Sequence, residues 1–396
     1  MKRSKKIGLI LVCIGLLGQI PFAYHRYQIG KLADRISAMK NSAGAADEGR
    51  FKDYPGVLHV HTSLGGHSTA TIEDLVKGAQ GLAFVVITEH AEPYFDTSAM
   101  TLNGVHNGTL FVGGSEVSTK SLDRLLLIPG WADATEWRSM ETPDFLAVYQ
   151  KQKQLAFVAY PEKFTSWDSA FNGVEIFNLN ESTKAVNKIR LFFEILWAYH
   201  KYPELTLATR FSRPDFNLRK FDEAASKRRV SLIAGSDAHS NIGFFLFGDE
   251  TGNKILKMKF DEYAMIFRIM KTHVLLDKGA ELTRESLLNA LRQGRDYVAM
   301  DILGDPRGFS FVAGKGVMGD EIKFDEIEPL TVRSPLRSRI VVLRDGKKVS
   351  ETSDTTEISF KPTECGAYRV EVFLDTLGKP FDQMPWIISN PIYVVP

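Results

Sequence analysis

Residues 230–239 read Val230-Ser231-Leu232-Ile233-Ala234-Gly235-Ser236-Asp237-Ala238-His239. The stretch begins with a mostly apolar run and ends with a carboxylate and an imidazole. An apolar run that does not alternate with polar residues fits a strand that is buried on both faces, as in a parallel sheet. The Asp237 and His239 side chains then lie at the carboxyl end of that strand.

Earlier segments of the chain have the same character, and together they form the strand-like runs 56–58, 82–87, 110–112, 155–159, 174–177, 205–209 and 230–234. Helical patterns lie between several of them. Residues 72–79 carry apolar side chains at helical spacing, and Thr71 with Asp74 forms a capping box. Alternating strands and helices predict an α/β barrel or a doubly wound sheet. In a barrel, the carboxyl ends of the strands converge on one mouth.

Metal-competent side chains follow several of these runs. In His59-Val60-His61 the two imidazoles lie on the same side of a strand, because strand side chains alternate with a period of two. The other strand ends supply His90, Glu116, Asp237 and His239. Mixed imidazole and carboxylate ligands suit Zn, Mn or Fe ions. The sequence therefore predicts a divalent metal site, and a set of unrelated polar strand caps is the alternative interpretation.

Four of these segments occur in an order that resembles the PHP (polymerase and histidinol phosphatase) family: His59-Val60-His61-Thr62, Ile87-Thr88-Glu89-His90, Gly114-Ser115-Glu116 and Gly235-Ser236-Asp237-Ala238-His239. The resemblance covers roughly residues 56–301. It implies a distorted seven-stranded β/α barrel with two or three metal ions at its mouth. It also implies hydrolysis, mostly of phosphate esters, although some members of the family cleave other esters.

The resemblance also implies a ligand set. One ion is held by His59, His61, Glu116 and Asp237, with Glu116 bridging to a neighbouring ion that His90 and His239 serve. The family often has Ser-Asp-Gly where this chain has Gly65-Gly66-His67, so an acidic ligand is missing and His67 is the candidate replacement. We therefore expect one or two ions rather than three.

Two further departures concern catalysis. Where the family often has Ala-His-Pro, this chain has Ala159-Tyr160-Pro161. A neutral phenol donates hydrogen bonds but binds metal weakly, so we expect Tyr160 to point into the mouth as a catalytic donor to substrate or bound water. Where the family usually has Thr-Asp-His, this chain has Thr88-Glu89-His90. We expect Glu89 to orient His90 without binding the metal itself.

Other polar residues have two interpretations each. Arg210 and Arg213 follow a strand-like run, where a cation meets an anionic substrate or forms an exposed salt bridge. Glu175 either faces the mouth or caps a strand. Of the other histidines, His106, His200 and His273 lie in turn or helix contexts and are not expected to bind metal. Residues 191–199 are strongly apolar and aromatic, which predicts a buried helix, with a lid or a lipid-contacting surface as the alternative.

The N-terminus has the composition of a membrane anchor. Lys2, Arg3, Lys5 and Lys6 precede an uncharged apolar run over residues 7–24. This pattern predicts an uncleaved signal-anchor with its basic end in the cytoplasm and the catalytic part outside it. A cleaved signal peptide and a secreted protein are the alternative. Residues 26–50 are polar, and residues 41–46 resemble a linker that holds the catalytic body a short way off the membrane.

After Asp301 the helical periodicity stops and short strand-like runs follow, with a hairpin signal at Asp345-Gly346. This pattern predicts a small all-β sandwich. It contains no histidine, and we assign it no chemistry. We expect three parts: a signal-anchor and linker over 1–50, a metallohydrolase barrel over 51–305 and a β-sandwich over 306–396.

The composition narrows the function. Lys+Arg 49 against Asp+Glu 48 leaves a formal charge of +1, which argues against a general nucleic-acid coat. Cys13 and Cys365 are too few for a disulfide framework. We expect a membrane-anchored, metal-dependent hydrolase, with phosphoesterase as the favoured activity, a small anionic ester as substrate and no nucleic-acid partner. A carboxylesterase or amidase on the same scaffold and a non-catalytic metal-dependent binding module are the alternatives.

Overall fold

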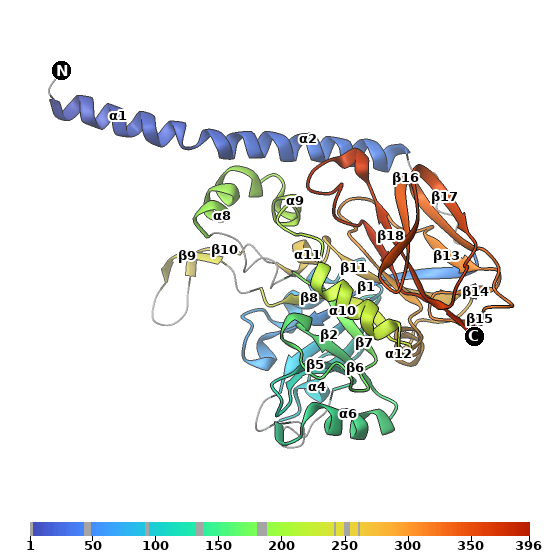
Figure 1. The fold of residues 1–396 in the computed structure, drawn as a ribbon. Coiled ribbons are helices and arrows are strands. Elements are labelled where there is room, and N and C mark those ends of the chain that lie inside the picture. Colours follow the sequence, from blue (N-terminus) through green and yellow to red (C-terminus); the bar gives the residue numbers. More distant parts are fainter. Residues whose placement is uncertain are drawn as a thin grey trace.

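A closed barrel of strands forms the centre of the molecule (Figure 1). The computed structural model describes residues 3–42, 49–91, 95–130, 138–179, 188–240, 243–248, 254–259 and 262–396. The barrel strands, in order around the ring, are β1 (Phe51–Val60), β2 (Phe84–His90), β4 (Thr109–Ser118), β5 (Arg124–Ile128), β6 (Leu155–Ala159), β7 (Gly173–Asn178) and β8 (Ser231–Ala238), which pairs again with β1.

One strand distorts this barrel. Neighbouring strands are parallel except at β5, which runs antiparallel to both β4 and β6. The expectation of a seven-stranded barrel is confirmed, but the prediction of a strand over residues 205–209 is wrong, because residues 205–208 belong to helix α9 (Pro203–Ala208) and Thr209 caps it. Pro203 stands in the first helical turn, where its missing N–H costs no hydrogen bond. The seventh strand is β5, whose Leu-rich sequence has no strong strand preference.

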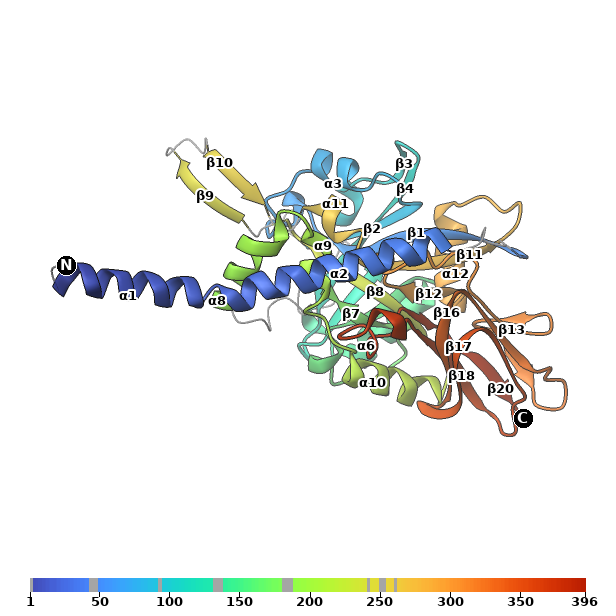
Figure 2. The same ribbon diagram turned by 90° about the horizontal axis from the view of Figure 1, so that it is seen from above.

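Short helices connect the strands and cover the outside of the barrel (Figures 1 and 2). Between β1 and β4 lie η1 (Ser63–Gly65), α3 (Ile72–Gly78), α4 (Thr97–Met100) and the short strand β3 (Gly104–His106). Farther along are α6 (Thr142–Lys151), η2 (Pro161–Lys163), α10 (Asp215–Ala225), α11 (Tyr263–Ile266) and α12 (Arg284–Gln293). The predicted capping box of α3 is present, with Thr71 accepting from the Asp74 N–H and Asp74 accepting from the Thr71 N–H.

The N-terminal helices α1 (Arg3–Leu17) and α2 (Ile20–Ser42) follow one another along nearly one line (Figure 1). Backbone bonds from Gly18 to Ile14 and from Ala23 to Gln19 bridge the turn between them. The segment Lys6–Lys40 is long and apolar enough to cross a membrane, with a mean hydropathy of 2.0 in its most apolar window and none of that window buried. A signal sequence has the same properties. Composition and length thus permit a membrane span at this end of the chain.

Helix α2 packs against the body of the protein. Ile29, Leu32 and Ile36 are buried to 1%, 4% and 5% exposure in the main apolar core. These positions share one helical face, so most of the segment that we expected to be a polar linker is instead a docked helix. The part of the linker motif at residues 43–46 lies outside the described residues. The orientation of α2 on the body is therefore fixed by packing.

The C-terminal strands continue the hydrogen-bonded network of the barrel. They are β13 (Ser310–Ala313), β14 (Gly316–Val317), β15 (Glu321–Lys323), β16 (Leu330–Arg344), β17 (Lys347–Phe360), β18 (Gly366–Phe373), β19 (Ile387–Ser389) and β20 (Ile392–Val395), with η4 (Asp375–Leu377) after β18. Asp345 and Gly346 join β16 to β17 with positive φ at both residues, the conformation of a type I′ hairpin turn. Strand β19 pairs with β12 (Asp296–Ala299), and β12 pairs with β11 (Lys271–Asp277), which pairs with β1.

A buried charge cluster lies in this connecting ladder. The His273 imidazole on β11 is 2.8 Å from an Asp53 carboxylate oxygen on β1 and 3.0 Å from an Asp301 carboxylate oxygen. Its ring stacks on Tyr297 of β12 at 4.8 Å between centroids. Burial opposes the charge, but the two carboxylates outweigh it and raise the pKa of His273 to about 10. The cluster joins strands of the ladder and lies apart from the residues expected to bind metal.

We predict that His273 makes stability depend on pH above neutrality. A raised folded-state pKa stabilises the fold fully below the ordinary value of 6.5, and the effect is lost as pH rises through about 10. The thermal midpoint of the wild type should therefore fall between pH 7 and pH 10. His273→Gln should be less stable at pH 7, because it leaves two buried carboxylates without a cation, and it should lack this part of the pH slope. Equal slopes for the two proteins would contradict the assignment.

Candidate metal centre

Three residues that converge at the barrel mouth have an unusual backbone conformation. His59, Tyr160 and Asp237 have φ values of 61°, 51° and 46°, in the left-handed region that non-glycine residues seldom adopt. They lie near the carboxyl ends of β1, β6 and β8. Strain of this kind persists only where the surrounding structure enforces it, and it concentrates at functional sites. Here it occurs at three strand ends that meet.

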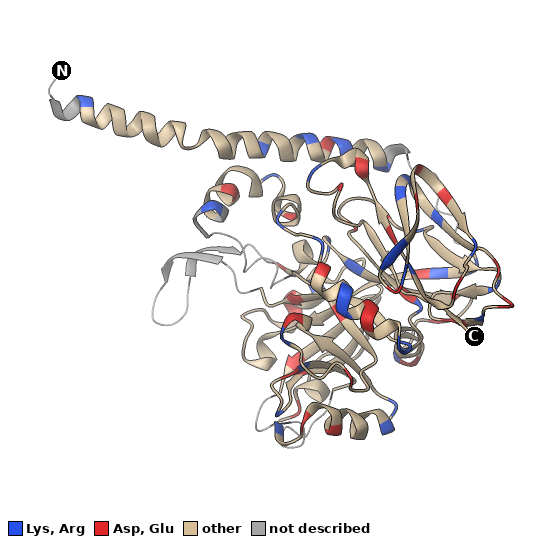
Figure 3. Cartoon of the chain, in the orientation of Figure 1, with Lys and Arg blue, Asp and Glu red and all other residues tan. Residues whose placement is uncertain are grey.

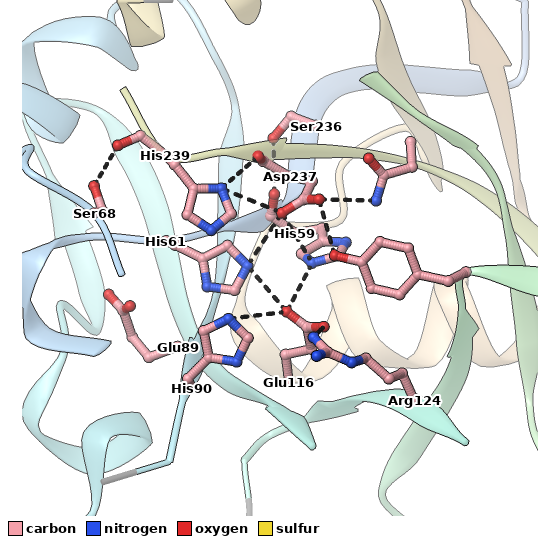
Figure 4. Close-up of polar contacts among 12 residues, drawn as sticks. His59, His61, Ser68, Glu89, His90, Glu116, Arg124, Ser236, Asp237 and His239 are labelled. Carbon is pink, nitrogen blue, oxygen red and sulfur yellow. Dashed lines mark hydrogen bonds and ion pairs between the residues drawn. The ribbon is translucent and has the colours of Figure 1, made fainter. Parts of the chain in front are cut away.

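The Glu116 carboxylate is the focus of the imidazoles (Figure 4). Its Oε2 atom lies 3.3 Å from His59 Nε2, 3.3 Å from His61 Nε2 and 3.5 Å from His90 Nε2. Glu116 is 3% exposed. Strand β4 thus presents one buried carboxylate to side chains from β1 and β2, as the sequence predicted for strand ends around one mouth.

The Asp237 carboxylate lies on the other side of the same imidazoles. Its Oδ1 atom is 3.6 Å from His59 Nε2 and 3.5 Å from His61 Nε2. His239 lies beside it, with Nδ1 3.3 Å from Oδ1. Potential ligand atoms within 4.8 Å of one another form two sets, His59 with His61 and Asp237, and His61 with His90 and His239. The two sets share His61, so the geometry offers room for one or two ions.

The arrangement fits a cation chemically. Neither ring nitrogen of the buried His61 makes a hydrogen bond within the described residues. A buried imidazole without hydrogen bonds is costly unless something else satisfies it. A divalent ion coordinated by imidazole nitrogens and carboxylate oxygens satisfies His61 and balances the buried carboxylates together. The residues present therefore fit a divalent metal ion.

The charges of these groups are strongly coupled. Burial disfavours the charged forms, yet the carboxylates of Glu175, Asp237 and Glu116 raise the pKa of His59 well above its ordinary value. Burial also opposes ionisation of Glu116, but the imidazoles of His59 and His61 hold the pKa of Glu116 well below its usual range. For His90, burial has the largest effect and lowers the pKa to about 3. A neutral His90 is in the state that binds a metal ion.

Glu175 faces the centre rather than capping a strand. Its Oε1 atom is 2.6 Å from His59 Nδ1, so the other ring nitrogen, Nε2, points toward Glu116. This is the support that metal-binding histidines commonly have. A Cβ atom on Gly235 would lie 1.5 Å from the same Glu175 oxygen. Glycine at position 235 therefore makes room for the Glu175 carboxylate.

Tyr160 supports Asp237. Its hydroxyl donates to Asp237 Oδ2 at 2.9 Å, and the Asn178 amide donates to the same oxygen at 3.1 Å. The sequence had suggested a donor to substrate or bound water, whereas the structure places the hydroxyl against a prospective metal ligand. Burial and the neighbouring carboxylates raise the pKa of Tyr160, so it remains a neutral donor. Its position makes it a residue that orients Asp237.

Glu89 contacts the loop after β1, and His67 lies beside His90. The Glu89 carboxylate accepts hydrogen bonds from the Thr62 N–H at 3.0 Å and from the Thr62 hydroxyl at 2.5 Å. Glu89 therefore holds the loop after β1 in place, whereas the sequence had suggested that it orients His90. A Cβ atom on Gly65 would lie 2.7 Å from this carboxylate. His67 is exposed, and its ring meets the His90 ring edge-on at 4.7 Å between centroids. Among the described residues, the two potential ligand sets do not include His67.

The structure does not bring Arg210 or Arg213 to the centre. Arg210 pairs with Glu194 and lies 3.3 Å from a ring nitrogen of His25 on α2. Arg213 binds Glu371 of β18 at 2.5 Å. Because residues 205–209 form a helix and no barrel strand, Arg210 does not stand at a strand end.

The cation beside the centre is Arg124, which the sequence analysis missed. Its Nη1 atom donates to Glu116 Oε1 at 2.6 Å, and its side chain is 45% exposed. Arg124 begins the antiparallel strand β5, and the amino end of an antiparallel strand lies at the mouth where its parallel neighbours end. A search for polar residues after apolar runs therefore could not find it.

Comparisons with known proteins give distant likenesses only. No family model and no curated protein matches the chain. Among solved structures, it is similar to PsfC from Pseudomonas syringae, at 12% identity and a TM-score of 0.35 over 60% of this chain and 88% of that one. A two-domain protein from Bacteroides vulgatus, containing a predicted PHP-like metal-dependent phosphoesterase, matches at 14% identity and a TM-score of 0.35, over 89% of this chain and 97% of that one.

The lesion-specific endonuclease EndoQ from Pyrococcus furiosus is a third similar structure. It matches at 13% identity and a TM-score of 0.32, over 67% of this chain and 63% of that one. Likeness at these scores does not decide what this chain binds or cleaves. The side chains of the centre carry the inferences that follow.

We predict that the centre binds a divalent ion through His59 and Asp237. His59→Ala or Asp237→Ala should lower the metal content of purified protein after dialysis, because each change removes a ligand from the shared set. His106→Ala is the matched control, since that exposed histidine bonds a backbone oxygen outside the centre. Elemental analysis measures the outcome, and unchanged stoichiometry in both variants would rule out the site.

Proposed function

We propose that this protein is a metal-dependent hydrolase that acts on phosphate esters. The observation that carries the proposal is the Glu116 carboxylate, which has three imidazole nitrogens around one oxygen and the exposed Arg124 guanidinium on the other. The first group suits a divalent ion, and the second suits an anion that approaches from solvent. A negatively charged ester placed between them meets positive charge on both sides.

The proposed ligands are those that the family resemblance implies, and the distances between their side chains support the proposal. His59, His61, Glu116 and Asp237 would hold one ion, and His90 with His239 would complete a neighbouring position. Zn, Mn and Fe are the ions that such ligands suit. A bound ion of this kind supplies an activated water at neutral pH and polarises the scissile group.

Other residues around the centre orient the ligands and bind the substrate. Glu175 and Tyr160 orient His59 and Asp237 through the hydrogen bonds described above. Glu89 fixes the loop that follows His61. Arg124 binds a phosphoryl oxygen, and Lys163, whose ammonium lies 5.2 Å from the centre of the Tyr160 ring, adds positive charge at the mouth. A neutral carboxylic ester gains little from either cation, which favours phosphate esters over the carboxylesterase alternative.

The location of the protein is part of the same proposal. Helix α1 anchors the chain in a membrane, with the barrel outside the cytoplasm, and residues 51–305 and 306–396 form the catalytic and β-rich parts. The uncharged apolar run and the basic residues before it support this reading. A small ester remains the proposed substrate, with no nucleic-acid partner.

Arg124 provides the test of substrate class. Arg124→Ala should lower kcat/KM for a phosphate monoester or diester by about tenfold to a hundredfold, the effect of losing one charged hydrogen bond. The same change should leave hydrolysis of a neutral carboxylic ester within about threefold. Arg333→Ala is the control, because that arginine pairs with Glu357 on the β-rich part. Preferential cleavage of carboxylic esters by the wild type would contradict the proposal.

Tyr160→Phe tests the supporting role of the hydroxyl. Loss of its bond to Asp237 should weaken metal affinity by about tenfold to a hundredfold and leave the fold intact. Tyr149→Phe is the matched control, since that buried hydroxyl donates to the Pro129 carbonyl away from the centre. Metal titration of both variants gives the result. Lost turnover with unchanged metal affinity would instead place the hydroxyl on the substrate.

A further inference from the structure

Two insertions rise from the mouth side of the barrel. Helix α8 (Lys188–Glu194) and the π-helical turn η3 (Ile195–Tyr199) come after the carboxyl end of β7. The hairpin of β9 (Gly243–Gly248) and β10 (Lys254–Lys259) comes after the carboxyl end of β8. In both ribbon views α8 and this hairpin lie on the side toward which α1 extends (Figures 1 and 2). The metal-competent side chains belong to the same ends of the strands.

The direction of α1 relative to the mouth is set by packing. The Phe22 ring of α2 stacks on Phe193 of α8 at 5.0 Å between centroids. The Trp197 indole N–H of η3 donates to the Gln19 side chain at 2.9 Å. Together with the buried face of α2, these contacts hold the helix on the body of the protein. If α1 crosses a bilayer, the body therefore has a defined orientation.

The length of the apolar run places the bilayer surface. Residues 7–24 carry no charge, and at 1.5 Å per residue they span about 27 Å, close to the hydrocarbon thickness of about 30 Å. Figure 3 shows the first charges beyond the apolar part of the helix on α2. Tyr24, Arg26 and Tyr27 are exposed there, and aromatic and basic residues are typical of a membrane boundary. Gln19 and Phe22 lie within the last two turns of the apolar run, so α8 and η3, which contact them, lie just inside this boundary.

The outer face of α8 and η3 has the composition of a lipid-contacting surface. Phe192 is 45% exposed and Leu196 is 64% exposed. Exposed cations flank them at Arg190 and Lys201. Apolar side chains bordered by basic residues bind the headgroup region of anionic membranes.

A groove of about 440 Å³ lies between α2 and η3 at the same level. Arg26, Lys31 and Trp197 are among the residues that line it. Asp34 also lines the groove, so its two cations leave one net positive charge beside the indole, which suits an anionic headgroup next to a membrane surface. Its lining includes the boundary residues Arg26 and Tyr27 of α2 and Trp197 of η3.

We infer that α8, η3 and the β9–β10 hairpin form a membrane-facing rim, so that the barrel mouth opens toward the bilayer and receives a phosphate ester carried on a lipid. The inference rests on the proposed function for its chemistry and on the packing of α2 for its geometry. The sequence of residues 191–199 predicted a buried helix, with a lipid-contacting surface as an alternative. The inference favours the lipid-contacting surface. A lipid substrate reaches the centre by moving in the plane of the membrane.

The first test measures whether the surface of η3 contacts lipid, and it does not depend on enzyme activity. In full-length protein with Cys13→Ser and Cys365→Ser, a polarity-sensitive dye is attached to Leu196→Cys, and to Thr352→Cys as the exposed control on β17. The labelled proteins are reconstituted in phosphatidylcholine vesicles with phosphatidylglycerol. The dye at position 196 should shift to shorter wavelength and be quenched by nitroxide lipids, and the dye at 352 should not. Equal behaviour at the two positions, or protein that does not stay with the vesicles, would overturn the inference.

The second test separates the substrate from the chemistry. Metal-loaded protein in vesicles is given phosphatidic acid or phosphatidylglycerol in its own membrane, the same lipids in separate vesicles, and a soluble phosphate ester. Lipid hydrolysis should occur in its own vesicles only. Phe192→Asp with Leu196→Asp should lower the ratio of lipid to soluble turnover at least about tenfold. Soluble turnover without lipid turnover would overturn the lipid substrate. If no ester is cleaved, the proposed function fails, and the dye result still decides the surface.

Discussion

The buried carboxylate of Glu116 organises the barrel mouth. A negative charge at 3% exposure is stable only when positive charge or strong donors surround it. Imidazoles from β1 and β2 lie on one of its oxygens and the guanidinium of Arg124 lies on the other. His59 has a left-handed backbone at this convergence, and Gly235 makes room for the Glu175 carboxylate that binds the other nitrogen of the His59 ring. The same surroundings give the centre its fit to a divalent ion.

The sequence predicted those parts of the centre that obey a strand rule. Side chains such as His61 and Asp237 follow apolar runs in parallel strands, so their meeting at one mouth was foreseeable. Arg124 was not, because it begins an antiparallel strand whose Leu-rich run has no strong strand preference. Arg210 was misplaced for the converse reason, since the apolar run before it forms the Pro-initiated helix α9. Local sequence does not record strand direction, and tertiary packing decides it.

The packing of helix α2 sets the direction of helix α1 relative to the barrel. Its sequence looks polar overall, yet Ile29, Leu32 and Ile36 form a narrow apolar face that only a body of the right shape can cover. That packing gives a fixed direction to the apolar helix α1 and brings α8 and η3 beside it. If α1 crosses a membrane, as we propose, this packing keeps the barrel mouth close to the bilayer.

Anomalous X-ray diffraction from metal-loaded crystals, at the absorption edge of the bound ion, tests the metal centre most directly. The predicted result is a peak at about 2.0–2.3 Å from the imidazole nitrogens of His59 and His61 and from carboxylate oxygens of Glu116 and Asp237. A second peak beside His90 and His239 would show that two ions bind. A loaded crystal whose anomalous peaks all lie elsewhere would contradict the assignment of this site.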